Sequence, residues 1–415
     1  NCDYDRLHEL VNHHDTLRAM LGHGAFDDVR YHFQTLKDNV SLLTEEFLEE
    51  VNLLVVQSGH VLVKKKDGEA LRGRCDSFVL ETNVHFPTDI NLLSDAMRKV
   101  ITLTAQWCDD LGLTDWRQSV YNVNHVKRLM RSAQNKKRSK ATSAERVEQN
   151  EALIVTAHQQ YLKVAQAYLD KARQTLALIE TQGLADLIAW VRKSEIEGFM
   201  VHADRQIDQI HRRVILGEVI APDEKVFSIF EPHTEWISKG KAGVPVELGV
   251  KVCILEDQYQ FILHHQVMQK QTDDQVAVAM VTGAQQRFPD LKACSFDKGF
   301  HSPANQSALK EQLELVALPR KGRLSQQAQE EESAEAFVKA RRAHSAVESA
   351  INGLEVHGLD VCPDHGIDGF KRYVALAVLA RNIHRIGDIL WQQDKAREKR
   401  KAKYADRDAT YKLAA

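Results

Sequence analysis

Apolar residues recur at three- and four-residue intervals in the first part of the chain, notably over 8–21 and 41–56. This spacing predicts amphipathic helices across residues 1–58. Thr44, followed directly by two glutamates, has the composition of a helix start. The period then shortens to two over 60–66 and 71–80, with Asp67-Gly68 between the runs. We therefore predict a β-hairpin whose second strand carries Asp76 near its middle.

The segment from 88 to 219 returns to helical spacing almost throughout. Tyr161, Ala165 and Tyr168 belong to one apolar face of a long helix in this segment. We therefore predict an all-helical block at 89–220. The middle of this block is dense in basic residues, among them Lys136, Lys137 and Arg138. Such a run is as consistent with a solvated helix face as with a phosphate-binding surface.

Strand-like patterns return after Pro222 and now alternate with helical segments. We predict strands over 225–230, 246–255, 259–267, 291–296 and 313–319, and helices over 273–288, 302–313, from 333 through Glu348, and over 369–390. Glu256-Asp257 lies between two of these strands and has the composition of a hairpin turn. The last segment, 391–415, is a basic tail whose composition is typical of disorder.

The order of these elements is that of a ribonuclease-H-like core. It runs strand with Asp76, two further strands, helix, strand ending at Asp297, helix, strand, and helix with Glu348. We expect an α/β fold with a mixed five-stranded sheet and flanking helices, formed by 59–88 and 221–390. The helical insertion domain at 89–220 would interrupt this core, and 1–58 would form a helical N-terminal region. In this topology the first strand lies beside the fourth, so Asp76 and Asp297 could meet.

Composition limits the function classes. The 415 residues contain 55 Lys and Arg against 58 Asp and Glu, for a net charge of -3. A uniformly basic nucleic-acid coat is therefore excluded, and any contact with nucleic acid must come from local patches. Six scattered cysteines without a C-x-x-C pair favour a reducing compartment. Without an apolar run of membrane-spanning length or a signal peptide, we expect a cytoplasmic, nucleoid-associated protein with no membrane partner. Because the chain opens at Asn1, we expect part of the natural N-terminus to be missing.

Asp76, Asp297 and Glu348 are the carboxylates that this topology would bring together. A lone Asp at a strand end is ordinarily a turn or capping residue, and a Glu within a helix usually faces solvent. Three carboxylates in one pocket, however, supply the oxygen ligands that Mg²⁺ requires. Two such ions, about 3.5 to 4 Å apart, support in-line displacement at phosphate. Other acids near these positions are Glu81, Asp89, Glu231 and Glu235. Glu231 is the strongest rival ligand, because it follows the predicted strand at 225–230.

Four stretches carry a resemblance to a known family. They are CDSFVLETNVHFPTD at 75–89, FSIFEPHTEWISKGK at 227–241, SFDKGFHS at 295–302 and HSAVESAINGLE at 344–355. The chain thereby resembles the DDE transposases of bacterial insertion sequences, in the heterogeneous group known as not classified yet. The resemblance implies Asp76, Asp297 and Glu348 as a catalytic and metal-binding triad with two Mg²⁺ ions, for which Mn²⁺ can substitute, and no small-molecule cofactor.

The same resemblance implies partners and a reaction. The partners would be double-stranded DNA, as transposon ends and as target, and a second copy of the chain in the synaptic complex. The reaction would be cleavage at the element end followed by attack of the freed 3′ hydroxyl on target DNA, by a cut-and-paste or a copy-out pathway. An N-terminal helical domain is also implied, and here it looks shortened.

Basic residues close to the carboxylates are candidates for contact with DNA. They are Lys239, Lys241, Arg320, Lys321, Arg341 and Arg342. Each could neutralise a DNA phosphate, or could instead be an exposed charge paired with a neighbouring glutamate.

Two other functions would use the same residues. One is a ribonuclease-H-like nuclease that hydrolyses DNA without joining it to a target. The other is a catalytically inactive DNA-binding repressor derived from a transposase, although all three acids are present. Strand transfer and metal-dependent nicking separate these alternatives.

Overall fold

The computed structural model describes residues 2–24, 26–137, 144–181, 187–238 and 245–414. The chain divides into two compact units. One, the sheet unit, comprises Asn1–Asn83 and His233–Ala415, and the other, the helical unit, comprises Val84–Pro232. No helix in the described part of the chain has both the length and the apolar content needed to cross a membrane.

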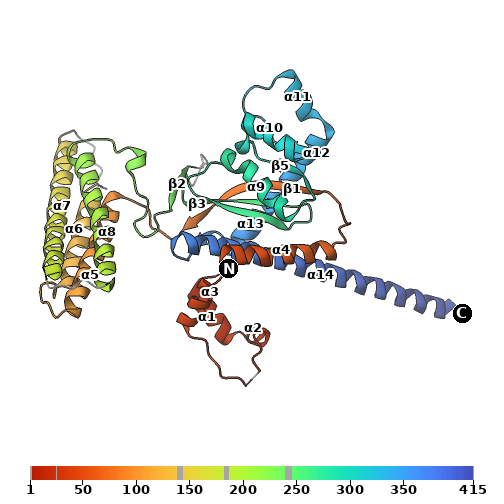
Figure 1. Ribbon diagram of the computed structural model, residues 1–415, viewed down its shortest axis with the longest axis horizontal. Coiled ribbons are helices and arrows are strands. Elements are labelled where there is room, and N and C mark those ends of the chain that lie inside the picture. The colour runs from red at the N-terminus through yellow and green to blue at the C-terminus, as the bar shows by residue number, and fades with distance from the viewer. Residues whose placement is uncertain (1, 25, 138–143, 182–186, 239–244, 415) are drawn as a thin grey trace. The chain divides into compact units, whose positions relative to one another are not determined.

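The described part of the helical unit contains four long helices (Figure 1). They are α5 (Asp89–Asp110), α6 (Ser119–Lys137), α7 (Ala144–Thr181) and α8 (Leu187–Ile210), with the π-helical turn η1 (His211–Ile215) and the 3-10 turn η2 (Pro222–Glu224) after them. Tyr161 and Ala165 of the predicted apolar face are fully buried in the core of this unit. Tyr161 also donates its hydroxyl to the carbonyl of Ile90 at 3.1 Å, which fastens α7 to the start of α5.

The strand predicted at 225–230 is wrong. Ile229 is 5% exposed and belongs to the core of the helical unit. The Ser228 hydroxyl accepts hydrogen bonds from the backbone N–H groups of Phe230 and Glu231, at 3.2 and 2.9 Å. This local bonding competes with a strand ladder. The apolar run therefore supplies core side chains from a turn.

The N-terminal helices belong to the sheet unit. They are α1 (Tyr4–His13), α2 (Asp15–Met20), α3 (Phe33–Ser41) and α4 (Glu45–Leu62). Thr44 caps α4 by accepting from the N–H of Phe47 at 3.2 Å, as its sequence predicted.

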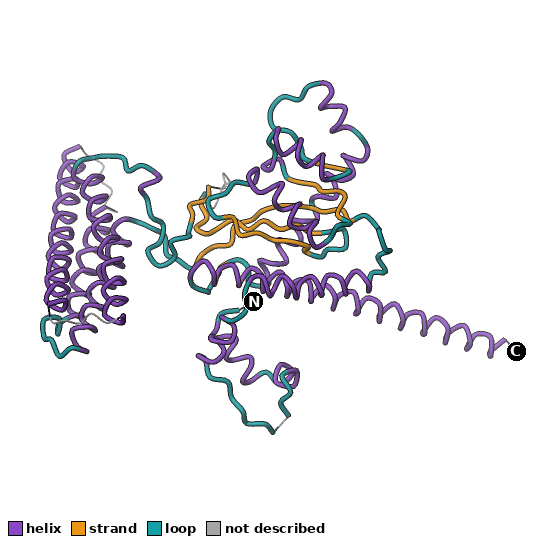
Figure 2. Tube along the Cα trace, viewed as in Figure 1, coloured by secondary structure: helices purple, strands orange, loops and turns teal. Residues whose placement is uncertain are grey.

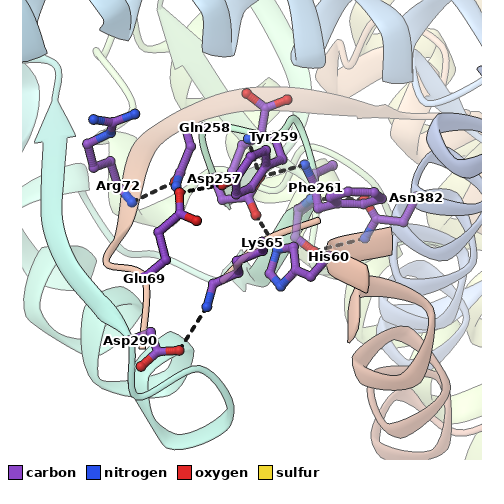
Figure 3. Close-up of polar contacts among 12 residues, drawn as sticks. His60, Lys65, Glu69, Arg72, Asp257, Gln258, Tyr259, Phe261, Asp290 and Asn382 are labelled. Atoms are coloured by element: carbon purple, nitrogen blue, oxygen red, sulfur yellow. Dashed lines mark hydrogen bonds and ion pairs between the residues drawn. The ribbon is translucent and has the colours of Figure 1, made fainter. Parts of the chain in front are cut away.

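The β-hairpin predicted from 60–66 is also wrong, because residues up to Leu62 complete α4. His60 is held by a buried contact, with its Nε2 2.6 Å from Asp257 Oδ2 (Figure 3). The other oxygen of Asp257 accepts from the N–H groups of Tyr259 and Phe261, at 2.8 and 3.0 Å. A side chain at Gly59 would meet the Phe261 ring at 2.2 Å, so glycine lets the helix and this ring pack together. Tertiary contacts thus override the strand-like period of the sequence.

Within the described residues, the sheet has seven strands. They are β1 (Leu71–Thr82), β2 (Glu235–Ser238), β3 (Val246–Glu256), β4 (Ile262–Met268), β5 (Leu291–Phe296), β6 (Leu315–Ala317) and β7 (Val361–Cys362). The order is β2-β3-β1-β5-β6, with β4 also paired to β3 and β7 to β1. β3 is antiparallel to β1, β2 and β4, whereas β5 is parallel to β1 and β6. The prediction of a five-stranded sheet is therefore corrected, because β2 and β7 add two strands. These strands are too short to show a two-residue period in the sequence.

Helices cover both faces of the sheet (Figures 1 and 2). Cys75 and Cys253 pack in a core with α9 (Asp273–Arg287) and α10 (Pro303–Gln312). Phe78 and Val252 pack in a second core with α13 (Ala346–Val356) and α14 (Gly366–Ala414). Successive side chains of a strand point to opposite faces. β1, β3 and β4 therefore contribute side chains to both cores.

Two predicted helices differ in extent. The one expected from 333 onward consists of α12 (Glu335–His344) and α13, preceded by α11 (Gln326–Ser333). The final helix begins at Gly366 and continues to Ala414, so the basic segment 391–414 is helical where its composition predicted disorder. Early in α14, Phe370, Val374 and Val378 are buried, which anchors the helix to the sheet unit.

Candidate active site

Asp76 lies on β1, and Asp297 directly follows the neighbouring strand β5, in the middle of the sheet. β1 runs parallel to β5, and the register pairs Cys75 with Phe296. Asp76 is the next residue of β1, and Asp297 directly follows the last residue of β5, so the two are adjacent where β5 ends. Asp76 is half-buried and Asp297 is exposed. The sheet therefore brings together two carboxylates that are 221 residues apart in the sequence.

Glu348 approaches from the helix after these strands. It lies in the first turn of α13, whose Val347, Ala350 and Leu354 are buried against the sheet. Glu348 itself is exposed, at the border between the packed face of the helix and solvent. The apolar spacing that predicted a packed helix is thus confirmed.

The surroundings of Asp76 change the pKa of its carboxyl group. Burial raises the pKa of its carboxyl to about 6, and the negative charges of Asp297, Asp273 and Glu348 act in the same direction. The backbone N–H of Ser77 lowers the pKa by donating to Asp76 Oδ1 at 2.8 Å. Asp297 and Glu348 are therefore both within electrostatic range of Asp76.

His344 borders the same carboxylates. Its Nδ1 lies 3.1 Å from the hydroxyl of Ser295, on β5. Burial lowers the pKa of His344, opposed by the charges of Asp297 and Glu348 and reinforced by that of Arg74. The His344 imidazole thus contacts β5 through Ser295 at the end of α12, directly before α13.

Three polar residues that lie near Asp76 were not identified from the sequence, namely Asp273, Ser77 and Lys251. Asp273, at the start of α9, lies 3.1 Å from Lys251 Nζ through each of its carboxylate oxygens. The hydroxyl of Ser77 donates to Asp273 Oδ1 at 2.7 Å. The sequence Thr272-Asp273-Asp274 signals only a helix start. Lys251 and Cys253 are two residues apart on β3, so their side chains lie on the same face of the strand. This spacing was the only sign in the sequence that Lys251 faces α9.

The competing acids have other surroundings. Glu235 accepts from the N–H of Lys270 at 2.6 Å, and Glu81 lies at the far end of β1, in register with Val361. Asp89 pairs with Arg213 at 2.6 Å in the helical unit. Glu231 is 6% exposed and also belongs to the helical unit.

Basic residues surround a cavity beside the Asp297 turn. The cavity has a volume of about 350 Å³ and is lined by His301, Arg320, Lys321, Arg323, Ser325 and Glu331 among others. Lys321 Nζ donates to the carbonyl of Gly299 at 2.9 Å, two residues after Asp297. Arg320 is paired with Glu331 at 2.5 Å. Part of the positive charge is therefore balanced. This agrees with the alternative interpretation, in which the basic residues pair with neighbouring glutamates.

The other basic candidates are dispersed. Arg341 and Arg342 are exposed in the last turn of α12, close in sequence to the Glu348 helix. Lys136 is exposed near the end of α6 in the helical unit. The remaining candidates, Lys239, Lys241, Arg138 and the side chain of Lys137, lie outside the described residues.

The donor set fits a hard divalent cation, because it consists of carboxylates. Burial and the neighbouring carboxylates Asp297, Asp273 and Glu348 all raise the pKa of Asp76. As the side chains stand, no group of three or more His, Cys, Asp and Glu residues is arranged to hold a metal ion within the described ranges. Carboxylates repel one another without a cation between them. We therefore expect side-chain rotation to accompany metal binding.

Comparison of the chain with known protein families, with curated proteins and with solved structures found no match.

Proposed function

We propose that the chain is a DDE-type DNA transposase that cleaves DNA at insertion-sequence ends and transfers the 3′ hydroxyl end to target DNA. The observation that carries this proposal is the adjacency of Asp76, on β1, and Asp297, at the end of the parallel strand β5, with Glu348 of α13 in electrostatic range of Asp76. The strand sequence β4-β3-β1-β5-β6, antiparallel for the first three and parallel for the rest, supports a ribonuclease-H-like core.

Asp76, Asp297 and Glu348 would hold two Mg²⁺ ions, with Asp76 and Asp297 flanking the shared ion and Glu348 holding the second. When bound, a pair of such ions supplies activation of the attacking oxygen and charge neutralisation at the departing one. Asp76 contributes its charge only when ionised, and a neighbouring cation would lower its pKa of about 6 and so favour the ionised form.

The basic cavity would hold the DNA backbone next to this site. Lys321 links the two, because its ammonium group contacts the turn that follows Asp297. Neutralisation of phosphates by Lys and Arg positions a duplex without reading its sequence. Arg320, Lys321 and Arg323 would therefore orient the phosphodiester, while the carboxylates act on it.

Nicking of supercoiled plasmid in Mg²⁺ or Mn²⁺ tests the proposal. We expect metal-dependent nicking by the full chain, abolished by Asp297→Asn while DNA binding in a mobility-shift assay survives. Asp67→Asn, at an exposed turn of the same unit, is the matched control and should remain active. An Asp297→Asn variant that nicks as fast as the parent chain would overturn the assignment.

Strand transfer separates a transposase from a nuclease that only hydrolyses. The substrate is a short duplex taken from the DNA that flanks the coding sequence, with its 3′ end already exposed, and the target is plasmid. A transposase joins the duplex to plasmid, and a nuclease releases fragments without joining them. Chain that shifts this duplex but is inert in Mn²⁺ would favour a repressor.

A further inference from the structure

Ser77 connects the candidate active site to the opposite face of the sheet. Asp76 and Ser77 are consecutive in β1, so their side chains point to opposite faces. The Ser77 hydroxyl meets Asp273 Oδ1 at 2.7 Å, whereas the Ser77 backbone N–H meets Asp76 Oδ1 at 2.8 Å. One residue thus bonds both carboxylates.

On the basis of the function proposed above, we propose that Asp273 is a positioning residue for Asp76. Asp273 fixes the side chain of Ser77, and the N–H of Ser77 orients the Asp76 carboxylate. A catalytic carboxylate that must bind a cation gains from such support, because partners of ligating groups set their orientation.

The bonding of Asp273 suits it to this role rather than to direct cation binding. Lys251 Nζ lies 3.1 Å from Oδ1 and 3.1 Å from Oδ2, and Oδ1 also accepts from Ser77. Both oxygens are therefore engaged by donors from β1 and β3. The Lys251 ammonium also pairs with the Asp273 carboxylate, which holds that carboxylate in place against Ser77.

The start of α9 is held firmly enough to act as a support. Gln275 Oε1 accepts from the N–H of Thr272 at 2.9 Å, which closes the first turn around Asp273. Asn305, 8% exposed, donates to the carbonyls of Asp274 and Phe300 at 2.6 and 2.9 Å. The same asparagine thereby joins the start of α9 to the turn after Asp297.

Gly299 leaves room between the two loops. A Cβ on Gly299 would lie 3.1 Å from Asp273 Oδ2 and 3.6 Å from Asp297 Oδ2. The carboxylate oxygens of Asp273 and Asp297 therefore both lie within 4 Å of the position that a Gly299 side chain would occupy. A methyl group there would press on the Asp273 carboxylate without changing any charge, which makes Gly299→Ala an independent probe of its position.

Cleavage kinetics over a range of Mn²⁺ concentrations test the proposal. We compare the parent chain with Asp273→Ala, Ser77→Ala and the double variant, and follow Mn²⁺ binding separately by electron paramagnetic resonance. Loss of a supporting partner typically costs about 10- to 100-fold in metal affinity or activity. We expect a fall of that size in kcat, a higher half-saturating Mn²⁺ concentration and an unchanged KM for DNA.

Three comparisons distinguish positioning from general destabilisation. The double variant should be no slower than the slower single variant, because the two residues act in one chain of contacts. Ser77→Thr keeps the hydroxyl and suits a strand, so it should restore activity. Asp274→Ala removes the neighbouring carboxylate of the same helical turn and should cleave normally.

The outcomes separate this inference from the function on which it rests. A parent chain that cleaves, with Asp273→Ala and Ser77→Ala equally active at limiting Mn²⁺, overturns the positioning role alone. A parent chain that neither cleaves DNA nor binds Mn²⁺ overturns the proposed function and the positioning role together. If Asp273→Ala does not fold, Ser77→Ala and Gly299→Ala decide the question, since full activity in both contradicts the inference.

Discussion

Arg74 and Glu256 face each other across the β1–β3 pair, with Arg74 Nη2 3.0 Å from Glu256 Oε2. Both are buried, at 9% and 1% exposure. Arg74 stands two residues before Asp76 and so on the same face of β1. An ion pair is thus built into the strand that carries the candidate catalytic aspartate.

This pair predicts a pH dependence of stability. Burial raises the pKa of Glu256 to about 7, from an ordinary value near 4.5. The folded state holds the proton more tightly, so the contribution is fully present below about pH 4.5 and is lost as pH rises through about 7. Glu256→Gln cannot titrate. The unfolding free energy of the parent chain relative to this variant should therefore fall by up to about 3 kcal/mol across that window.

Urea unfolding of both chains between pH 4.5 and 8 measures this difference. A constant difference across the series would show that Glu256 titrates normally in the folded state.

Gly249 is predicted to be intolerant of a side chain. Its Cβ would lie 2.1 Å from the backbone oxygen of Leu80, because Gly249 pairs with Glu81 on β1 and with Glu235 on β2. Backbone cannot yield as a side chain can, so Gly249→Ala should cost about 2 kcal/mol or more of unfolding free energy. Gly24→Ala, whose Cβ would meet nothing within 4 Å, is the matched control. Equal melting temperatures for the two variants would refute the close approach.

Lys321 should contribute to DNA affinity through charge alone. Lys321→Ala removes one cation from the cavity beside Asp297. We expect weaker binding of every DNA sequence to a similar degree, and a slope of log affinity against log salt reduced by about 1. Lys37→Ala, an exposed lysine of α3, serves as the control. An unchanged slope for Lys321→Ala would place the DNA elsewhere.

Much of the sheet could be predicted from the sequence because its period is local. The β3–β4 hairpin, α9, β5 ending before Asp297, and α10 all lie close to where the pattern placed them. The errors have tertiary causes. Residues 60–62 alternate like a strand but complete α4, since the side chain of His60 contacts that of Asp257, 197 positions away.

Some residues of the candidate site could likewise be predicted from the sequence, and others depend on tertiary contacts. Asp76, Asp297 and Glu348 could be proposed from the order of elements and from the resemblance. Asp273 could not, because its meaning depends on a contact with Ser77 across 196 positions. A helix start rich in Asp has a sufficient local explanation in the helix dipole, and nothing local distinguishes Asp273 from Asp274.

The location of bound Mn²⁺ tests the central claim most directly. An anomalous difference map from crystals of the full chain grown with Mn²⁺ should show density coordinated by the carboxylate oxygens of both Asp76 and Asp297, with Glu348 turned toward it. Mn²⁺ bound only at other sites, with these three carboxylates pointing away from one another, would contradict the account.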